Sequence, residues 1–335
     1  MKSTSPPCTT TKQSVLIVGG GSIGERHVRC WQRTGRSDVI LCESNENRAK
    51  EVAERYGIRW ESNFAQVLEK ESPACIVLCT PAPAHVPMAL QALEHGSHVL
   101  IEKPLSVDMH QLDTLAEAAK DHTVAVAYVW RMHPAIRRAK QHLAEGSIGR
   151  PLHAVARCGQ DFATLRPGYE NTYYSRHDLG GGAIQDGLTH VANAIEMLLG
   201  PTTSVFCEAD HLGIPGVEVE DVVGVVARND KAITVYSFSQ TQKPNEFTID
   251  IHGETGSLRI DLSGKRIGVF SGGCWSFEDT SYDDHDVLFT AQADAFLDAV
   301  ERKAPPGCTL AEGIHTLRFN LACLESARTG SKVQL

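Results

Sequence analysis

The chain has 335 residues and a mass of 36.5 kDa, a length that favours two domains. Hydrophobic residues make up 42% and charged residues 22%, close to the average of globular proteins, which excludes global disorder. The 32 Lys and Arg against 41 Asp and Glu leave a net charge of −9, which disfavours binding to nucleic acids or anionic membranes. No apolar run is long enough to span a bilayer.

The N-terminus and the cysteines both predict a cytoplasmic protein. The first residues, MKSTSPPCTTTKQ, lack the apolar core of a secretory signal, so residues 1–12 are interpreted as a short polar tail. The 10 cysteines are scattered without any CxxC pair, and several lie inside apolar runs. This usage is typical of a reducing compartment and predicts neither a disulfide framework nor a zinc ribbon.

Short apolar runs alternate with helical patterns in residues 13–128. Strands are predicted at 14–18, 38–42, 74–79, 98–102 and 124–129, and helices at about 22–34, 49–56, 86–93 and 108–120. Strands that alternate with helices imply right-handed crossovers and a parallel sheet covered on both faces. The pattern therefore predicts a doubly wound α/β domain.

Residues 129–335 have a different character, with helices first and tight turns between strands later. Helices are predicted at 134–145, 184–199, 287–302 and 310–328, and strands at 222–227, 233–238, 247–251 and 258–262. Alternating apolar and polar residues around the Gly253–Gly256 turn are typical of a half-buried antiparallel hairpin. We expect a second, α+β domain with a large, mostly antiparallel open sheet and helices on one face.

A glycine-rich loop follows the first predicted strand and opens the first helix. Its sequence, GGGSIG, fits G-x-G-x-x-G in the context that a dinucleotide site requires. Gly19 allows the tight turn, Gly21 lets a pyrophosphate approach the backbone, and Gly24 permits close packing of helix and strand. Ser22 and Ile23 begin the helix, whose free N–H groups would bind the anion. The alternative is a glycine turn in an α/β domain that binds no nucleotide.

An acidic residue at the end of the second strand indicates which nucleotide is bound. Glu43 stands nineteen positions after Gly24, where a carboxylate can accept hydrogen bonds from both ribose hydroxyls and would repel a 2′-phosphate. NAD is therefore favoured over NADP, and Arg48 nearby is the one feature that favours NADP.

Polar residues at two other strand ends predict the chemical site. Lys103, within Glu102–Pro104, follows the strand at 98–102 and is expected to point toward the ligand, because ligands of open α/β sheets lie beyond the carboxyl ends of the strands. Thr80 and Pro81 end an earlier strand at the same edge. The alternative for Lys103 is a solvated pair with its neighbouring glutamate. For His85, a helix-start or packing role is favoured over catalysis.

A second candidate group lies after the triple glycine at 180–182. If the following segment is helical, Asp186 and His190 are at i and i+4 and their side chains meet on one face. The carboxylate would orient the imidazole and raise its pKa, as a general base for alcohol oxidation requires. Asn193 would extend this polar stripe. One alternative is an ordinary surface ion pair. Another is that the two residues bind a metal ion, which is disfavoured because no recognisable motif supplies a third ligand.

Several motifs carry a family resemblance. They are GGGSIG with the following ERH, CTP at 79–81, HVLIEKPL at 98–105, YVWRMHP at 128–134, GGGAIQDGLTH at 180–190 and LACLESARTG at 321–330. Together they resemble the glucose–fructose oxidoreductase / inositol dehydrogenase / MocA family over nearly the whole chain and in the same order. The resemblance implies a Rossmann domain at 13–128 and a substrate-binding, oligomerising domain at 129–335.

The resemblance also implies roles for individual residues. Lys103 corresponds to the lysine that lies between nicotinamide and substrate, while Asp186 and His190 correspond to the family's Asp-x-x-x-His motif, with the histidine as acid/base. Asn193 replaces an aspartate that is common in the family. The cofactor contacts that the resemblance implies are Thr80, Pro81, His85, Glu102 and Lys103. The aromatic-rich stretch 161–174 is similar to a sub-group of sugar and sugar-nucleotide oxidoreductases.

The sequence thus predicts NAD-dependent oxidation of a secondary alcohol on a sugar, sugar derivative or cyclitol, or the reverse reduction. Lys103 would stabilise negative charge on the reacting oxygen, and His190 would take the hydroxyl proton. Lys103 is the rival base if burial lowers its pKa. Candidate substrate contacts are Tyr128, Arg131, Arg166, Tyr173 and Tyr174.

Two other functions fit the same motifs. Some members of the family use NAD redox-neutrally to cleave glycosides, and others are nucleotide-binding sensors without turnover. We predict no metal, nucleic-acid or membrane partner. The 222–227 run, VVGVVA, is apolar on both faces, which predicts a homodimer or homotetramer formed through the open sheet.

Overall fold

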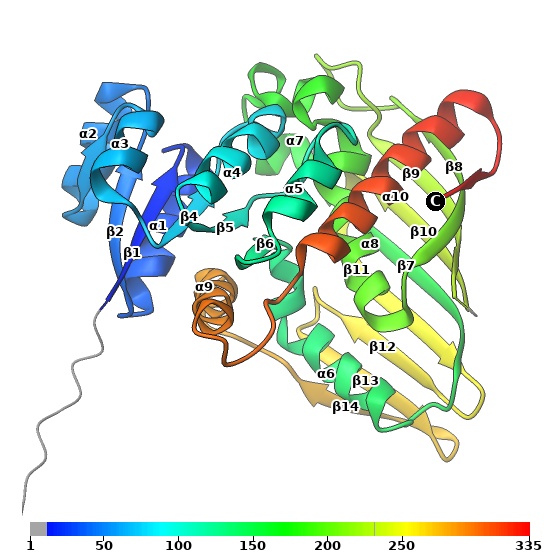
Figure 1. Cartoon of the computed structure of the whole chain (residues 1–335). Helices are drawn as coiled ribbons and strands as arrows, with labels where there is room; N and C mark the ends of the chain where they lie inside the picture. Colours follow the sequence, from blue (N-terminus) through cyan, green and yellow to red (C-terminus); the bar gives the residue numbers. More distant parts are fainter. Residues whose placement is uncertain (1–11, 231) are drawn as a thin grey trace, which may run out of the picture.

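The structure, a computed structural model, describes residues 12–230 and 232–335. The chain forms two sheets, one of six strands and one of nine, with helices packed on both (Figure 1). This is the α/β Rossmann domain and the larger, mostly antiparallel open sheet that the sequence predicts. The predicted polar tail, apart from Lys12, lies outside the described residues. Among the helices of the described part of the chain, none combines the length and hydropathy needed to cross a membrane.

The first sheet is entirely parallel and has the strand order β3-β2-β1-β4-β5-β6. Its strands are β1 (Gln13–Val18), β2 (Ser37–Cys42), β3 (Arg59–Glu61), β4 (Cys75–Leu78), β5 (His98–Ile101) and β6 (Val124–Val126). Its helices are α1 (Ser22–Arg33), α2 (Glu46–Tyr56), α3 (Phe64–Glu71), α4 (His85–Glu94) and α5 (Leu112–Ala118). Strand order reverses at β1, where β2 lies on one side and β4 on the other. In open α/β sheets ligands bind at the carboxyl ends of the strands beside such a reversal.

Three features of this part differ from the prediction. The strand β3 and the helix α3 were not predicted, because β3 has only three residues and α3 buries only Val67 and Leu68. The strand predicted at 124–129 ends at Val126, and the short helix η2 (Val129–Met132) follows.

The second sheet has the order β14-β13-β12-β11-β7-β10-β9-β8-β15. Its strands are β7 (Pro151–Asp161), β8 (Thr202–Asp210), β9 (Val222–Asn229), β10 (Ala232–Ser239), β11 (Thr241–Gly253), β12 (Ser257–Asp261), β13 (Arg266–Ser271), β14 (Cys274–Asp279) and β15 (Val333–Gln334). Neighbouring strands are antiparallel except β10 and β7, which are parallel. The predicted hairpin is confirmed, with Ile249 opposite Ile260 in β11 and β12.

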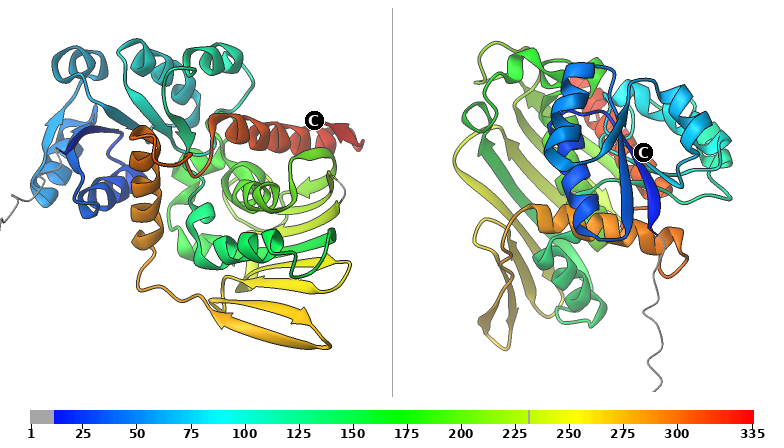
Figure 2. Two further views of the ribbon diagram at one scale, coloured as in Figure 1. Left: turned by 60° about the horizontal axis from the view of Figure 1, so that its bottom comes forward. Right: turned by 90° about the vertical axis from the view of Figure 1, so that its left-hand side faces the viewer.

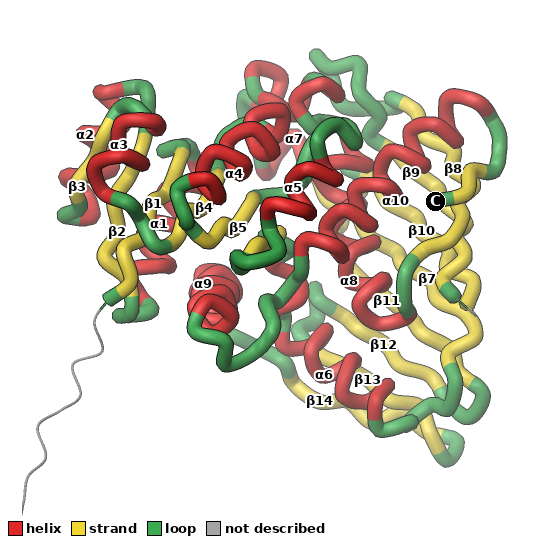
Figure 3. The backbone as a smooth tube through the Cα atoms, in the orientation of Figure 1, coloured by secondary structure: helices red, strands yellow, loops and turns green. Residues whose placement is uncertain are grey.

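Helices cover one face of this sheet, and the other face is open (Figures 2 and 3). The covering helices are α6 (Pro134–Ala144), α8 (Thr189–Leu199) and α10 (Leu310–Thr329). The core between the layers contains Ile136 of α6, Ile195 of α8 and Phe319 of α10, packed on strand residues such as Ile251 and Leu258. Burial of such side chains contributes about 1.5–3 kcal/mol each to stability.

The helix α9 (Asp286–Val300) returns to the first sheet. Its Phe296 and Leu297 pack with Val15 of β1 and Trp31 of α1. A segment near the C-terminus thus completes the core on one side of the nucleotide-type domain. The division into 13–128 and 129–335 stays a prediction. The remaining short helices are η1 (Ala82–Ala84), α7 (Phe162–Leu165), η3 (Tyr169–Asn171), η4 (Tyr173–Ser175), η5 (His177–Leu179) and the π-helix η6 (Ile184–Leu188).

Candidate active site

The glycine loop between β1 and α1 has the geometry that its pattern predicts. Gly19 has a φ of +98°, and a Cβ there would lie 2.8 Å from the carbonyl oxygen of Cys79. A Cβ on Gly24 would overlap the carbonyl of Gly19, whereas one on Gly21 would meet nothing within 4 Å. The α1 N-terminus has no side-chain cap, so its first N–H groups face this open space. The loop therefore fits a pyrophosphate, with Ser22 and Ile23 as the first helical residues.

Glu43 faces this loop from the end of β2. Its Oε2 accepts a hydrogen bond from the Gly20 N–H at 2.6 Å, and its Oε1 accepts one from the Asn45 N–H at 2.8 Å. Each carboxylate oxygen keeps a second lone pair, so the group remains able to accept ribose hydroxyls. The position agrees with the predicted role in NAD binding.

Arg48, the residue that favoured NADP, is engaged elsewhere. Its Nε donates to the Gly20 carbonyl at 2.7 Å, and its terminal nitrogens form ion pairs with Glu25 at 2.5 Å and Glu51 at 2.8 Å. Two carboxylates thus compensate its charge, which leaves little positive potential for a 2′-phosphate. This arrangement favours NAD.

The structure brings Lys103, Asp186 and Tyr173 together. The Lys103 ammonium donates to Oδ1 of Asp186 at 2.8 Å and to the Asp186 carbonyl at 3.0 Å. The Tyr173 hydroxyl donates to the same Oδ1 at 2.8 Å. The lysine and aspartate side chains are only 14% and 12% exposed. The predicted alternative for Lys103, a solvated pair with the neighbouring glutamate, is therefore wrong.

The charges of this cluster stabilise one another. Burial by itself lowers the pKa of Lys103, but Asp186, together with Tyr173 and Glu102, outweighs burial and holds that pKa above its ordinary value. Although burial raises the pKa of Asp186, the lysine keeps it below its usual range. The negative charge of Asp186, together with burial, raises the pKa of Tyr173. Lys103 is thus a cation and Tyr173 a neutral hydroxyl, so the proposal of Lys103 as a base through a lowered pKa is wrong.

His190 lies in the first turn of α8 between two aromatic rings. Its imidazole stacks on Trp130, with centroids 5.8 Å apart, and meets Tyr128 edge-on at 6.0 Å. Its Nδ1 is buried and has no hydrogen-bond partner in the described part of the chain. Burial and the charge of Lys103 lower the pKa of His190 to about 3, against the opposing effect of Asp186.

Two expectations about His190 are therefore wrong. The pKa is lowered where a rise was predicted, because burial outweighs the neighbouring carboxylate. Among the described residues no hydrogen bond joins Asp186 to His190, since Asp186 binds Lys103 and Tyr173. The predicted continuous helix is a π-helix followed by α8, and its wider turn changes the i, i+4 spacing on which the expectation depended.

The five predicted substrate contacts fall into two groups. Tyr173 is 44% exposed and contacts Asp186, so it lies at the site. Arg166, which follows α7, is exposed. These two residues remain substrate-contact predictions.

The other three are buried and bind protein groups. Tyr128 and Tyr174 are each 1% exposed, the first with its hydroxyl against a threonine of α8 and the second within an aromatic cluster. The Arg131 guanidinium binds the Asn193 side chain at 2.7 Å and Glu312 at 2.7 Å. Of the three, Tyr128 borders the site through its edge-on contact with His190. Asn193, expected to extend the polar stripe, serves as the partner of Arg131.

His85 connects the loops that follow β4 and β5. Its Nε2 lies 2.8 Å from the Thr80 carbonyl, and its Nδ1 lies 3.0 Å from the Pro104 carbonyl. Burial lowers its pKa. The neutral imidazole carries a single N–H, so it donates to one of these two carbonyl oxygens at a time, and both ring nitrogens face the backbone. The packing role favoured from the sequence agrees with these contacts, and Thr80 and Pro81 remain cofactor-contact predictions.

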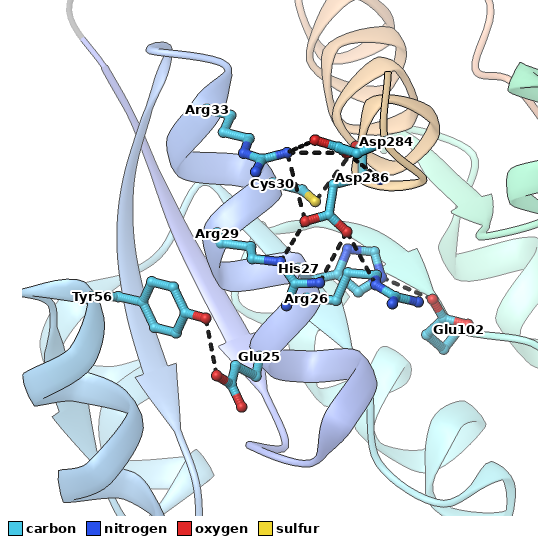
Figure 4. A network of polar contacts seen from close by, with 10 residues as sticks. All are labelled: Glu25, Arg26, His27, Arg29, Cys30, Arg33, Tyr56, Glu102, Asp284 and Asp286. Atoms are coloured by element: carbon cyan, nitrogen blue, oxygen red, sulfur yellow. Dashed lines mark hydrogen bonds and ion pairs between the residues drawn. The ribbon is translucent and has the colours of Figure 1, made fainter. Parts of the chain in front are cut away.

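The Glu102 side chain reaches His27 of α1 (Figure 4). Its Oε1 lies 2.8 Å from Nε2 of His27, and its Oε2 accepts the Lys103 N–H at 3.0 Å. Burial raises the pKa of Glu102, but the hydrogen bonds and charges of His27 and Lys103 together outweigh burial and lower that pKa. Glu102 therefore positions the backbone of Lys103, and its cofactor contact remains a prediction. His27 was missed as a site residue, and its only signal was the ERH motif.

The same view shows how α9 is fixed against α1 (Figure 4). The Asp286 carboxylate forms ion pairs with Arg29 at 2.5 Å, Arg26 at 3.2 Å and Arg33 at 3.6 Å. The Cys30 thiol contacts the Asp286 carbonyl at 3.6 Å. These pairs join the helix of the glycine loop to the C-terminal part of the chain.

Three consecutive glycines let the loops of the site meet. Gly180 has a φ of +89°, and a Cβ there would lie 2.8 Å from Cγ of Pro104. A Cβ on Gly181 would overlap carbonyl oxygens of the preceding aromatic loop. Gly182, also at φ +89°, would place a Cβ 2.5 Å from Oε2 of Glu220. The triple glycine thus permits the close approach that brings Lys103 to the π-helix.

The parallel sheet has the strand order of a Rossmann fold, and its glycine loop is open to a ligand. Together with the buried lysine–aspartate pair, these features define a nucleotide-dependent oxidoreductase. The chain belongs to the GFO/IDH/MocA family. Residues 13–129 match the model described as an oxidoreductase family with an NAD-binding Rossmann fold, and residues 136–259 match the GFO/IDH/MocA C-terminal domain. The resemblance and the assignment of NAD as cofactor are confirmed.

Individual relatives cover almost the whole chain. The chain is 26% identical over 333 residues to a 1,5-anhydro-D-fructose reductase of Ensifer adhaerens, covering 95% of this chain and 97% of the relative. It is 25% identical to a scyllo-inositol 2-dehydrogenase (NAD(+)) of Bacillus subtilis, covering 95% of each. A levoglucosan dehydrogenase in complex with NADH and levoglucosan has the same fold, with a TM-score of 0.88, 22% identity and coverage of 97% and 99%.

Proposed function

We propose that the protein is an NAD-dependent dehydrogenase that oxidises a secondary alcohol of a sugar, sugar derivative or cyclitol, or catalyses the reverse reduction. The observation that carries the proposal is the buried Lys103–Asp186 pair at the same sheet edge as the glycine loop. The names of the relatives, which act on an anhydrosugar and an inositol, support the substrate class.

Bound NAD would supply the acceptor for hydride. The protein's part is to hold the reacting oxygen and to manage its proton. Lys103 remains protonated beside Asp186, so its ammonium donates a hydrogen bond to the reacting oxygen and stabilises negative charge there. Asp186 acts by holding the ammonium in one direction.

His190 is the proton acceptor in this proposal. Its pKa of about 3 keeps the imidazole neutral at physiological pH, so the ring can accept a proton, but it is a weak base until negative charge develops on the substrate oxygen beside it. Stacking on Trp130 and edge-on contact with Tyr128 fix the ring without a hydrogen bond from Asp186. Tyr173, whose pKa is raised, serves as a hydrogen-bond donor near the substrate.

The proposal is tested by following cofactor absorbance while a panel of sugars, anhydrosugars and cyclitols is added with NAD. Net formation of NADH supports a dehydrogenase. Release of a free sugar without net NADH would establish the redox-neutral glycosidase instead. Binding without either change would establish the sensor, although the joint presence of Lys103, Asp186 and His190 argues against that class.

We further propose that the open face of the second sheet forms a homodimer or homotetramer interface. Phe206, Val226, Val235 and Val155 lie directly opposite one another on β8, β9, β10 and β7, so they form one apolar row on a single face. Phe206 is 45% and Val226 49% exposed. The predicted two-faced apolar run is an alternating strand, whose other side chains are buried against the helices. Exposed apolar rows of this kind mark interaction sites.

The proposed location is the cytoplasm, and the proposed partners are a small-molecule sugar or polyol and further copies of the chain. The location is supported by the burial of Cys30, Cys75, Cys158 and Cys323, which behave as small hydrophobic residues. The net charge of −9 argues against nucleic-acid and membrane partners.

A further inference from the structure

A buried carboxylate lies directly behind the segment that carries Asp186. Glu220 precedes β9 and is 7% exposed. Its Oε1 accepts the N–H of Ile184 at 2.8 Å, and its backbone carbonyl accepts the N–H of Ala183 at 2.9 Å. Glu220 therefore binds two consecutive amides at the start of the π-helix.

These amides have no partner within the helix itself. The first N–H groups of any helix lack an intrahelical acceptor, and a carboxylate there also interacts favourably with the helix dipole. Ile184 is the first residue of the π-helix, and Asp186 follows two positions later. The backbone position of Asp186, and through it the direction of the Lys103 ammonium, thus depends on the acceptor that Glu220 provides.

His177 holds the other carboxylate oxygen. Its Nε2 lies 2.5 Å from Oε2 of Glu220, and this hydrogen bond raises the pKa of the imidazole. The His177 carbonyl accepts the side-chain amide of Gln185 at 3.1 Å. When this imidazole is protonated, its charge offsets the cost of burying the carboxylate, since a buried charge requires a partner.

The backbone at Gly182 is also shaped to leave room for the Glu220 carboxylate. At Gly182 a Cβ would lie 2.5 Å from the carboxylate, and the φ of +89° disfavours any other residue. Glycine is therefore required where Glu220 approaches the chain.

From these contacts we propose that Glu220 is a positioning residue for the catalytic pair, with His177 as its counter-charge. The inference rests on the proposed function for its kinetic readout. No step of the reaction passes through Glu220. Its role is to hold the Ile184 amide, and with it Asp186, at the distance that Lys103 requires.

The test compares Glu220→Gln with Glu220→Ala. Glutamine keeps a carbonyl acceptor for Ile184, whereas alanine leaves both Ile184 and His177 without a partner. Because a misplacement of about 1 Å costs roughly a hundredfold in rate, we expect kcat of Glu220→Ala to fall by about that factor, with the KM for NAD nearly unchanged. Glu220→Gln should recover most of kcat. Glu218→Ala, at an exposed glutamate two positions before Glu220, is the matched control and should match wild type.

Hydrogen–deuterium exchange separates this inference from the proposed function. Amides of residues 183–188 should exchange faster in Glu220→Ala and at the wild-type rate in Glu220→Gln, whether or not any sugar is turned over. A wild type inactive on the whole panel would contradict the proposed function only. Wild-type exchange and wild-type kcat in Glu220→Ala would overturn the positioning role, as would a loss of kcat that Glu220→Gln does not recover. If Glu220→Ala fails to fold, the exchange rates of residues 183–188 and kcat are measured in Glu220→Gln and His177→Gln instead. Wild-type values of both quantities in His177→Gln would show that His177 is not needed as the partner of Glu220.

Discussion

Lys103 and Asp186 are separated by 83 positions in the sequence but form a buried ion pair with Nζ and Oδ1 2.8 Å apart. Lys103 extends from the end of β5, and Asp186 extends from the π-helix before α8. Each raises the stability of the other's charged form, because the pair is largely shielded from water. The pair joins the nucleotide-type domain to the segment that carries His190, the proposed proton acceptor.

Replacing Asp186 by Asn should change the alkaline pH dependence. Without the carboxylate, burial lowers the pKa of Lys103 against only the weaker opposing effects of Tyr173 and Glu102, so the lysine loses its proton at a lower pH. Since the neutral amine stabilises the reacting oxygen less, the fall of kcat at high pH should move toward neutrality. A pH–rate profile at saturating substrate checks this. An alkaline limb that stays in place would show that Asp186 does not control the lysine.

The kcat of the wild type for oxidation should be nearly independent of pH between about 5 and 8, with no rising acid limb in this range. An ordinary histidine base with a pKa of about 6.5 would give a rising limb in this range. The imidazole of His190 is already neutral there, since its pKa is about 3. His190→Ala should lower kcat by roughly a hundredfold to ten-thousandfold, the usual contribution of a positioned acid/base. A wild-type limb near 6.5 that disappears in His190→Ala would contradict the neutral-histidine account.

The same lowered pKa predicts an acid-dependent loss of stability. The unfolded chain binds a proton at His190 near pH 6.5, while the folded protein resists it until about pH 3. The unfolded state therefore binds more protons in this window, and the free energy of unfolding should decrease as pH falls through it. Denaturant unfolding of His190→Phe should show a shallower decrease than wild type. Equal slopes for the two proteins would refute the assignment.

Glu43→Ala should weaken NAD binding and improve tolerance of NADP. The carboxylate accepts ribose hydrogen bonds and repels a 2′-phosphate, and Arg48 is already bound by Glu25 and Glu51. Fluorescence titration with NADH and NADPH measures both effects. Tighter binding of NADPH than of NADH by the wild type would reverse the cofactor preference.

Val226→Asp should dissociate the proposed oligomer, because it places a charge at the centre of the apolar row on the open sheet. Light scattering at micromolar concentration should give a dimer or tetramer mass for wild type and a monomer mass for the variant. Val287→Asp on α9, a position 41% exposed and away from that sheet, is the control and should keep the wild-type mass. A monomeric wild type would rule out the interface.

Local patterns predicted most of the fold because they act over short distances. The glycine loop at Gly19–Gly24, the strand before Lys103 and the hairpin around 253–256 each depend on neighbouring residues, and the structure has them as expected. The three-residue strand β3 has too little periodicity to be recognised.

The site itself was predicted only in part, because its partners are set by tertiary packing. Spacing in an assumed α-helix paired Asp186 with His190, whereas the π-helix and the approach of Lys103 pair it with the lysine and with Tyr173. The pKa of His190 depends on burial, which no local pattern records. Arg131 illustrates the same limit, since its charge pointed to a ligand but its partner Glu312 lies in α10.

The central claim is that the Lys103 ammonium, held by Asp186, stabilises the reacting oxygen. The most direct measurement is single-turnover formation of NADH by wild type and Lys103→Ala, with NAD saturating and with one sugar from the panel. An oxyanion-type donor contributes about 2.7–4 kcal/mol, so the account predicts a rate lower by roughly a hundredfold or more in the variant, with NAD affinity nearly unchanged. A variant that forms NADH at the wild-type rate and is impaired only in NAD binding would contradict it.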